Sequence, residues 1–169
     1  MSDKHLNDAF IYSGGRSAFG RHGGGLSSIR PDDLLAHVIK SVVESSGFTP
    51  ETFEDVVMGN TNGAGEDCRN VARFASLRAG MPTTLAGITV NRLCGSGLAA
   101  TLDAARGVKV GEGDLFLAGG VESMSRAPLV LSKATSAFDR GQQIADSTLG
   151  ARFTNPEYAK IFGNDTMPQ

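Results

Sequence analysis

The sequence changes character within ITVNRLCGSGLAA, which runs from Ile88 to Ala100. The residues up to position 90 are largely β-branched and apolar, and they predict a strand over 85–90. The residues from position 95 onward are small and helix-compatible, and they predict a helix over 95–110. A strand that leads directly into a helix is the repeating unit of α/β folds.

Cys94 lies in the turn between this strand and this helix. The first N–H groups of a helix are unpaired and the helix dipole is positive there, so both favour a thiolate. Such surroundings lower the pKa of a cysteine from about 8.5 to roughly 3.5–7.5. Gly95 and Gly97 let backbone N–H groups approach a reacting carbonyl without an intervening Cβ. The alternative is a structural cysteine in the core, which is common in proteins.

Strand and helix patterns alternate outward from this turn. Further strands are predicted over 9–13, 55–59 and 114–118. Residues 55–59 have a continuous apolar centre, as in a strand covered on both faces. The alternation predicts an α/β fold, in which a parallel sheet has helices on both sides.

Two more helices are predicted between these strands. The first begins at Pro31 and ends before Gly47, and its apolar stripe consists of Leu34, Leu35, Val38, Ile39, Val42 and Val43. The second ends at Gly80, and its stripe consists of Val71, Phe74, Ala75 and Leu77. His37 falls on the polar side of the first helix and is interpreted as a solvated surface residue.

Composition excludes several classes of function. The chain has 169 residues, 40% of them hydrophobic, and a formal net charge of -2, so recognition of nucleic acid by bulk charge is not expected. No segment is apolar for long enough to cross a membrane. Cys68 and Cys94 are far apart and have no metal-ligand spacing, so we expect reduced thiols, no bound metal and a cytoplasmic location.

The regular pattern breaks at Glu122. Polar residues and prolines interrupt the following sequence, and an excursion of this length is usually functional. We therefore divide the chain into an α/β core over 1–121 and the beginning of an irregular loop domain over 122–169. Because no later strand or helix returns to the core, the sequence is interpreted as a fragment.

A catalytic cysteine also requires a proton acceptor. The histidines of the chain are His5, His22 and His37, all upstream in polar or loop contexts. Cys68 has neither a base nor a flanking glycine pair, so we interpret it as structural. The general base for Cys94 is therefore not evident in this sequence.

Several motifs resemble those of the thiolases, the acyl-CoA acetyltransferases. They are Asn91 to Gly97 around the cysteine, Arg30 to Leu34, Val57 to Asn60, and Gly119 to Pro128. Within that family, the segments Ala64 to Arg73 and Thr148 to Pro156 are most similar to 3-oxoadipyl-CoA thiolases. The resemblance implies a thiolase-like three-layer α/β/α fold with a mostly parallel mixed sheet, of which this chain is the N-terminal half.

The resemblance also implies a reaction. Cys94 would attack a 3-oxoacyl-CoA or thioester carbonyl and hold the acyl group, and its backbone N–H would contribute to an oxyanion hole. The products of thiolytic cleavage would be acetyl-CoA and a shortened acyl-CoA, for example succinyl-CoA from 3-oxoadipyl-CoA, and condensation is the reverse. Coenzyme A and acyl-CoA would be substrates, with no separate cofactor.

Binding residues and assembly are implied in the same way. Met167 matches the loop-domain methionine beside the pantetheine, and Phe153 lies near another apolar pantetheine contact. Thr166 stands where some thiolases have a histidine, so no pyrophosphate contact is assigned there. The family forms dimers or dimers of dimers, so a homodimer or homotetramer is expected.

The family's Gly-His-Pro histidine and Cys-x-Gly cysteine have no counterpart in this sequence. The chain alone is therefore expected to be inactive. One alternative is a non-catalytic half-domain that acts as an assembly module, because a truncated sheet exposes an edge and an apolar face. Another is a peroxide-sensing thiol protein centred on Cys94.

Overall fold

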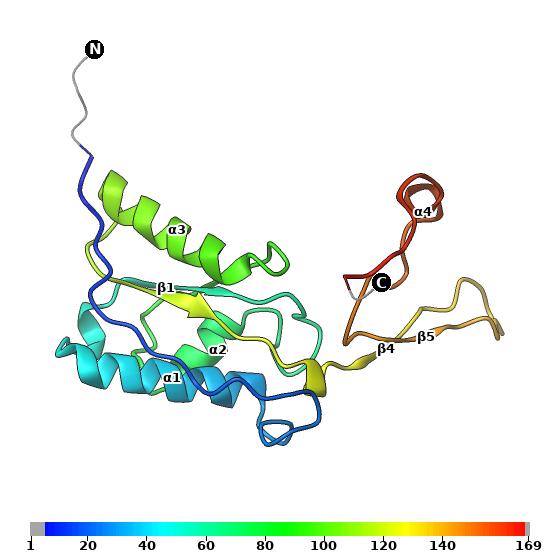
Figure 1. Ribbon diagram of the computed structural model, residues 1–169, viewed down its shortest axis with the longest axis horizontal. Helices are drawn as coiled ribbons and strands as arrows, with labels where there is room; N and C mark the ends of the chain where they lie inside the picture. Colours follow the sequence, from blue (N-terminus) through cyan, green and yellow to red (C-terminus); the bar gives the residue numbers. More distant parts are fainter. Residues whose placement is uncertain (1–5, 168–169) are drawn as a thin grey trace, which may run out of the picture.

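The computed structural model describes residues 6–167 (Figure 1). Its helices are α1 (Pro31–Ser46), α2 (Val71–Arg78), α3 (Ser96–Val110) and α4 (Pro156–Phe162), and its 3-10 turns are η1 (Pro50–Thr52) and η2 (Met124–Arg126). Its strands are β1 (Asp55–Gly59), β2 (Ile88–Val90), β3 (Phe116–Gly120), β4 (Leu129–Leu131) and β5 (Ile144–Asp146).

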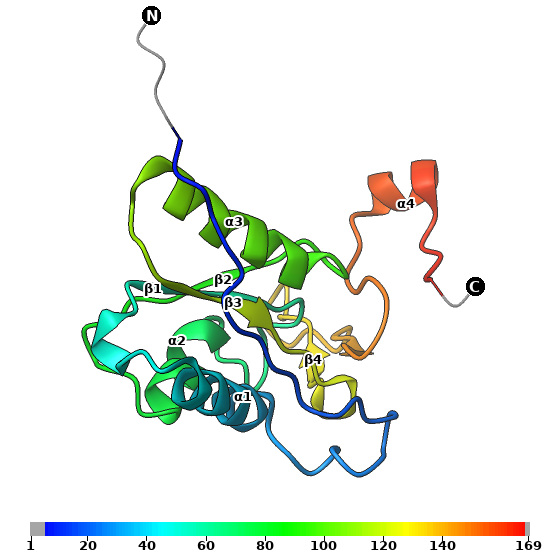
Figure 2. The same cartoon turned by 60° about the vertical axis from the view of Figure 1, so that its left-hand side comes forward.

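The centre of the molecule is a parallel sheet in the order β2-β1-β3. Val57 of β1 pairs with Ile88 on one side and with Ala118 on the other. Helix α3 covers one face of the sheet, whereas α1 and α2 cover the other (Figures 1 and 2). This arrangement confirms the three-layer α/β/α fold expected from the sequence.

Strand β1 is covered on both faces, as its continuous apolar pattern predicts. Val56 and Met58 belong to the core shared with α1 and α2, while Val57 packs against Ala100 and Ala104 of α3. Val56 is fully buried, and burial of such a side chain stabilises a fold by about 1.5–3 kcal/mol. Strand β1 therefore packs against the helices on both faces of the sheet.

Helix α1 has the predicted limits. Pro31 is its first residue, and Gly47 ends it with a φ of 77°, in the left-handed region that favours glycine. Leu35 and Ile39 are buried, and His37 is exposed as expected. The first helical stripe is confirmed.

Helix α2 buries only part of the predicted stripe: Val71 and Ala75 are fully buried, as expected. Phe74 and Leu77 are 48% and 39% exposed, so their assignment to the core is wrong. The buried positions include Ala72, Ala75 and Ser76. These small side chains allow α2 to pack closely on the sheet and α1, which leaves the bulky residues on the outer side.

Strand limits differ from the predictions where side chains bind the backbone. Strand β2 is shorter than predicted, because the carbonyl of Leu85 accepts a hydrogen bond from the Arg73 guanidinium. Strand β3 begins two residues later than predicted. The Glu54 carboxylate binds the N–H groups of Asp114 and Leu115, which takes them out of the strand ladder.

The predicted strand at 9–13 is wrong. The segment has no regular secondary structure, and Phe10 and Ile11 are each 87% exposed. In the described residues β3 is an edge strand, and a groove of about 750 Å³ lies between β3, α1, α3 and the N-terminal segment. A strand requires a hydrogen-bonded neighbour, and the groove separates this segment from the nearest sheet edge.

Beyond Val121 the chain leaves the sheet. Strands β4 and β5 form an antiparallel pair, with Leu129 opposite Asp146, and α4 projects away from the three layers (Figure 1). The expected loss of regular pattern after Glu122 gives short elements joined by long loops. The division into domains at 1–121 and 122–169 stays a prediction.

Candidate active site

The loops after β1, β2 and β3 meet at one edge of the sheet, because parallel strands end on the same side. The N–H of Asn60 donates to the carbonyl of Val90 at 3.1 Å, and the N–H of Val121 donates to the carbonyl of Gly59 at 3.1 Å. Ligands of open α/β sheets bind outside the carboxyl ends of the strands. The side chains carried by these loops are therefore the candidates for a functional site.

Cys94 lies in the loop after β2 and is exposed. The next residue, Gly95, is the N-cap of α3. Ser96 closes the turn, since its Oγ donates to the carbonyl of Leu93 at 2.6 Å and accepts from the N–H of Arg92 at 2.8 Å. The thiol-bearing residue is thus at the surface, beside the end of α3 that carries unpaired N–H groups and positive partial charge.

Gly59 and Gly120 allow neighbouring backbone to approach the ends of β1 and β3 closely. A Cβ at Gly59 would lie 2.3 Å from the carbonyl carbon of Ser96 and 2.5 Å from the nitrogen of Gly97. A Cβ at Gly120 would lie 2.8 Å from the carbonyl oxygen of Gly59. A side chain at Gly59 would therefore displace the helix start and the cysteine next to it, and one at Gly120 would push the ends of β1 and β3 apart.

A buried amide and a buried carboxyl lie under the loop after β1. The Nδ2 of Asn60 donates to Asp67 Oδ1 at 3.1 Å and to the carbonyl of Val121 at 3.0 Å. Burial, followed by the charge of Glu122, raises the pKa of Asp67 to about 6. The buried Oδ1 of Asn60 has no hydrogen-bond partner within residues 6–167. A protonated Asp67 carries an O–H group, which is a donor beside the side-chain amide of Asn60.

The loop after β1 is also bound to the segment that follows the sheet. The Glu122 carboxylate accepts hydrogen bonds from the N–H groups of Thr61 at 2.7 Å and Asn62 at 3.2 Å. The side chain of Asn62 donates to Ser147 Oγ at 2.9 Å and accepts from Arg152 at 3.1 Å. Segments that are distant in sequence therefore meet next to the turn that carries Cys94.

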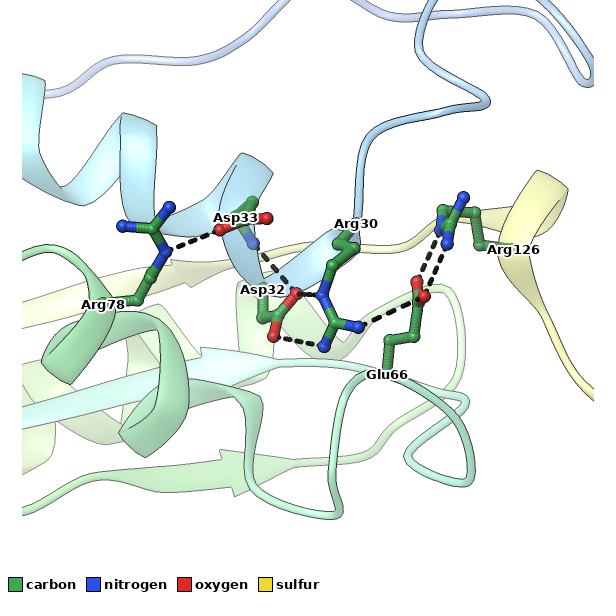
Figure 3. Close-up of polar contacts among 6 residues, drawn as sticks. All are labelled: Arg30, Asp32, Asp33, Glu66, Arg78 and Arg126. Carbon is green, nitrogen blue, oxygen red and sulfur yellow. Dashed lines mark hydrogen bonds and ion pairs between the residues drawn. The ribbon is translucent and has the colours of Figure 1, made fainter.

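An ion-pair cluster holds the outer side of the same loop (Figure 3). Glu66 binds Arg126 through two contacts of 2.5 Å and Arg30 through one of 3.3 Å. Arg30 also forms a two-fold contact with Asp32, at 2.8 and 2.9 Å. The hydrogen bond from Arg126 lowers the pKa of Glu66. The cluster therefore joins the beginning of α1, the loop after β1 and η2.

The two residues predicted to contact pantetheine lie outside the three-layer core. Met167 is 93% exposed, and Phe153 is 51% exposed beside Arg152. Figures 1 and 2 show their segment beyond the N-terminal end of α3. Their roles toward coenzyme A stay predictions, as does the role of Cys94.

Within residues 6–167, no hydrogen bond joins Cys94 to a histidine. His22 and His37 are exposed, and His37 lies on α1, on the face of the sheet opposite α3. His5 lies outside the described residues. Cys68 is exposed and has a φ of 50°, so it is a loop residue rather than part of the core.

Sequence reasoning missed the polar residues that fix the loops. Glu122, Thr61 and Asn62 were not proposed as site residues, although each lies two or three residues after the end of a strand and therefore at the carboxyl edge of the sheet. That position was the available signal. Arg152 carried no comparable signal, because its contact with Asn62 joins residues 90 positions apart.

Within residues 6–167, no group of three or more His, Cys, Asp or Glu side chains is arranged to hold a metal ion. The helices of the same part of the chain are all too short or too polar to span a bilayer. The site is therefore described by its thiol, its backbone N–H groups and the polar loop residues around them.

A family model described as "Thiolase, N-terminal domain" matches residues 9–161. The chain belongs to the thiolase family. The resemblance found in the sequence motifs is thereby confirmed. Thiolases of the β-ketoadipyl type are among its relatives: the beta-ketoadipyl-CoA thiolase of Escherichia coli is 53% identical over 165 residues, and that of Pseudomonas aeruginosa is 50% identical over 163 residues.

Solved thiolase structures have the same fold. The crystal structure of the Bacillus anthracis acetyl-CoA acetyltransferase matches with a TM-score of 0.79 and 31% identity, over 85% of this chain and 36% of that chain. The matched regions of the two β-ketoadipyl-CoA thiolases cover 97% and 96% of this chain but 41% of each relative. The thiolase chain described here thus spans about two fifths of the length of these relatives.

Proposed function

We propose that this chain is the acyl-carrying part of a thiolase, with Cys94 as the nucleophile. The observation that supports the proposal most strongly is the position of this cysteine, exposed directly before the N-cap of α3 in a chain of the thiolase family. A thiol beside a helix N-terminus is in suitable surroundings for nucleophilic catalysis.

In the proposed cleavage, the Cys94 thiolate attacks the 3-oxo carbonyl carbon of a 3-oxoacyl-CoA. The bond between C2 and C3 breaks, and the acetyl-CoA carbanion takes up a proton from a general acid. The shortened acyl group remains on sulfur as a thioester until the thiolate of a second coenzyme A displaces it. Condensation runs through the same steps in reverse.

The backbone N–H of Cys94 is proposed to stabilise the negative charge that develops on the carbonyl oxygen. An N–H group that is already oriented needs no rearrangement during the reaction, which makes such donors effective. The family's histidine and acid cysteine have no counterpart in this sequence, so proton transfer requires residues beyond these 169.

The substrate proposed for the whole protein is 3-oxoadipyl-CoA, cleaved to succinyl-CoA and acetyl-CoA. Support comes from the names of the relatives at 53% and 50% identity, which are beta-ketoadipyl-CoA thiolases. The acetyl-CoA acetyltransferase of Cupriavidus necator is less similar, at 40% identity over 136 residues. The substrate class common to all of them is an acyl-CoA.

Met167 and Phe153 are proposed to contact the pantetheine chain of coenzyme A. Their exposed apolar side chains are suited to a ligand of that kind. We further propose that coenzyme A and acyl-CoA act as substrates without a separate cofactor, and that the protein is a homodimer or homotetramer. The two free thiols favour a cytoplasmic location.

The nucleophile can be identified by incubating the native polypeptide with acetyl-CoA, followed by digestion and peptide mass spectrometry. We expect an acetyl adduct on the peptide containing Cys94. The adduct should disappear in Cys94→Ser and persist in Cys68→Ser. An adduct on Cys68, or full activity in Cys94→Ser, would contradict the proposal.

A second function, that of an assembly module, is supported by the groove beside β3. This apolar space of about 750 Å³ adjoins the free edge of the sheet and an exposed segment that contains Phe10 and Ile11. Unpaired sheet edges and large apolar surfaces favour association with another polypeptide. In this alternative, the chain binds a partner and performs no chemistry.

Sedimentation velocity of the 169-residue chain tests the second function. The assembly hypothesis predicts concentration-dependent association over the micromolar range. A chain that sediments as a monomer across that range would contradict it, whatever the result of the acetylation experiment.

A further inference from the structure

The carboxylate of Glu122 fixes the backbone of the loop after β1. Its Oε2 accepts a hydrogen bond from the N–H of Thr61 at 2.7 Å, and its Oε1 accepts one from the N–H of Asn62 at 3.2 Å. A carboxylate that accepts two consecutive N–H groups defines both the position and the orientation of that backbone. Because Glu122 itself is exposed, it can be replaced without opening a cavity in the core.

Thr61 transmits this constraint to the turn that carries the cysteine. Its Oγ1 donates to the carbonyl of Leu93 at 3.3 Å, and its own carbonyl accepts from the Nδ2 of Asn91 at 3.0 Å. Asn91 in turn accepts from the N–H of Leu93 at 2.9 Å through its Oδ1. Thr61 is therefore bound to the first and third residues of the sequence Asn91 to Cys94.

Leu93 requires such support. Its φ is 50°, in the left-handed region that non-glycine residues rarely adopt. A residue in this conformation persists only when its surroundings impose it. Here the surroundings are the bonds to Asn91 and Thr61 and the bond from Ser96, and together they set the direction in which the chain enters Cys94.

From this chain of contacts we infer that Glu122 is a positioning residue for Cys94, acting through Thr61. The inference rests on the proposed function, in which Cys94 is the reacting group. Glu122 touches neither substrate nor thiol in this role. It holds the loop after β1 so that the turn at Leu93 keeps Cys94 at the beginning of α3.

The test compares alkylation of the two cysteines in the intact 169-residue chain. Iodoacetamide is added at one fixed pH, samples are quenched over time, and peptide mass spectrometry gives a rate constant for Cys94 and another for Cys68. In Glu122→Gln the amide places N–H groups opposite a backbone N–H, so one hydrogen bond is lost. Glu112→Gln is the matched control, because Glu112 is also exposed but lies at the other end of α3.

We expect the Cys94 rate constant to fall about two- to ten-fold in Glu122→Gln but not in Glu112→Gln, since the thiol loses its fixed position beside the helix N-terminus. Cys68 lies in the loop after β1 that Glu122 holds, so its rate should change less than that of Cys94. Thr61→Val, which removes the hydroxyl, should have the same effect, whereas Thr61→Ser, which keeps it, should behave like the native chain. The double variant should be no slower than either single variant, because both interrupt the same path.

An unchanged Cys94 rate in Glu122→Gln would overturn the inference. So would a fall in Glu112→Gln as large as that in Glu122→Gln, which would indicate a non-specific effect of removing a carboxylate. Failure of the proposed function is distinguishable, because it appears as an acetyl adduct on a residue other than Cys94 in the native polypeptide, independently of how the alkylation rate responds to Glu122.

Discussion

Gly59 determines how closely α3 approaches the sheet. The residue is buried at the end of β1, and the space that a side chain would need is occupied by the backbone of Ser96 and Gly97. Backbone atoms cannot move aside as the end of a flexible side chain can. The position of Cys94 therefore depends on the absence of one methyl group at the end of the neighbouring strand.

Gly59→Ala should destabilise the chain by about 1–3 kcal/mol, because the added Cβ forces the start of α3 away from the sheet. Urea denaturation followed by circular dichroism measures the change. Gly25→Ala is the control, since a Cβ at Gly25 meets nothing within 4 Å. Equal midpoints for the native chain and Gly59→Ala would contradict the close approach.

Asp67 gives the fold a specific dependence on pH. Its pKa is 3.8 in an ordinary environment and about 6 in the folded chain, mainly because of burial. The folded state thus binds more protons than the unfolded state between these values. The contribution of protonated Asp67 to the free energy of unfolding is therefore complete below pH 3.8, and it is lost as the pH rises through 6.

Asp67→Asn should remove this loss, because an amide cannot ionise and its NH₂ can donate to the unpartnered Oδ1 of Asn60. Relative to the native chain, we expect the variant to gain on the order of 1–3 kcal/mol between pH 4 and pH 7. Urea midpoints at several pH values measure the difference. Asp139→Asn should instead be less stable than the native chain at neutral pH, since hydrogen bonds from Thr135 and Gly141 lower the pKa of Asp139. If the urea midpoints of Asp67→Asn and of the native chain changed with pH in the same way, the raised pKa of Asp67 would be refuted.

At the scale of elements, ion pairs connect helices to loops and to one another. Besides the cluster around Glu66, Arg78 of α2 binds Asp33 of α1 at 2.8 Å (Figure 3). The Glu66 side chain is only 24% exposed and Arg126 29%, so their contact is screened less than a fully exposed pair. The cluster should therefore contribute more to stability than surface ion pairs usually do.

Glu66→Gln should lower the free energy of unfolding by about 1–2 kcal/mol, and the difference should shrink in high salt. Glu157→Gln is the matched control, because Glu157 pairs with Lys160 at 2.6 Å but is 75% exposed. We expect a loss below about 0.5 kcal/mol for the control. Equal losses in the two variants, measured by thermal and urea unfolding, would contradict the special role of the cluster.

The elements that the sequence predicted correctly are those determined by local pattern. Pro31 and Gly47 mark the limits of α1, and the apolar run in β1 indicates burial on both faces. The prediction was wrong at 9–13, where strand-like residues have no neighbouring strand, and at Phe74, where small residues pack better on the sheet. The contact between Glu122 and Thr61 depends on tertiary structure and could not be read from local pattern.

At the scale of the whole molecule, the described sheet has an open edge at β3. Strand β3 ends the described sheet, and the groove next to it is lined by residues of α1, α3 and the N-terminal segment. Tyr12 contacts Phe48 edge to face, yet Phe10 and Ile11 remain almost fully exposed. Apolar side chains in this arrangement are available to another polypeptide segment.

Ala118→Lys should weaken association of the chain. Ala118 is an exposed residue of β3 that lines the groove, and a charge there opposes burial by a partner. Sedimentation velocity should show a shift toward monomer, with little change in the free energy of unfolding. Ala134→Lys, a change of the same kind in the exposed loop between β4 and β5, should sediment like the native chain. Equal association in both variants would exclude the groove as the contact surface.

The bond between Glu122 and Thr61 also has a consequence for biosynthesis, because the two residues are 61 positions apart. At 5–20 residues per second, the ribosome adds Glu122 about 3–12 s after Thr61. Cys94 is added 28 positions before Glu122, so at the same rate the nascent turn before Cys94 lacks its support for about 1.4–5.6 s after the thiol has been made. The emerging chain therefore carries its proposed nucleophile for a time without the contact proposed to position it.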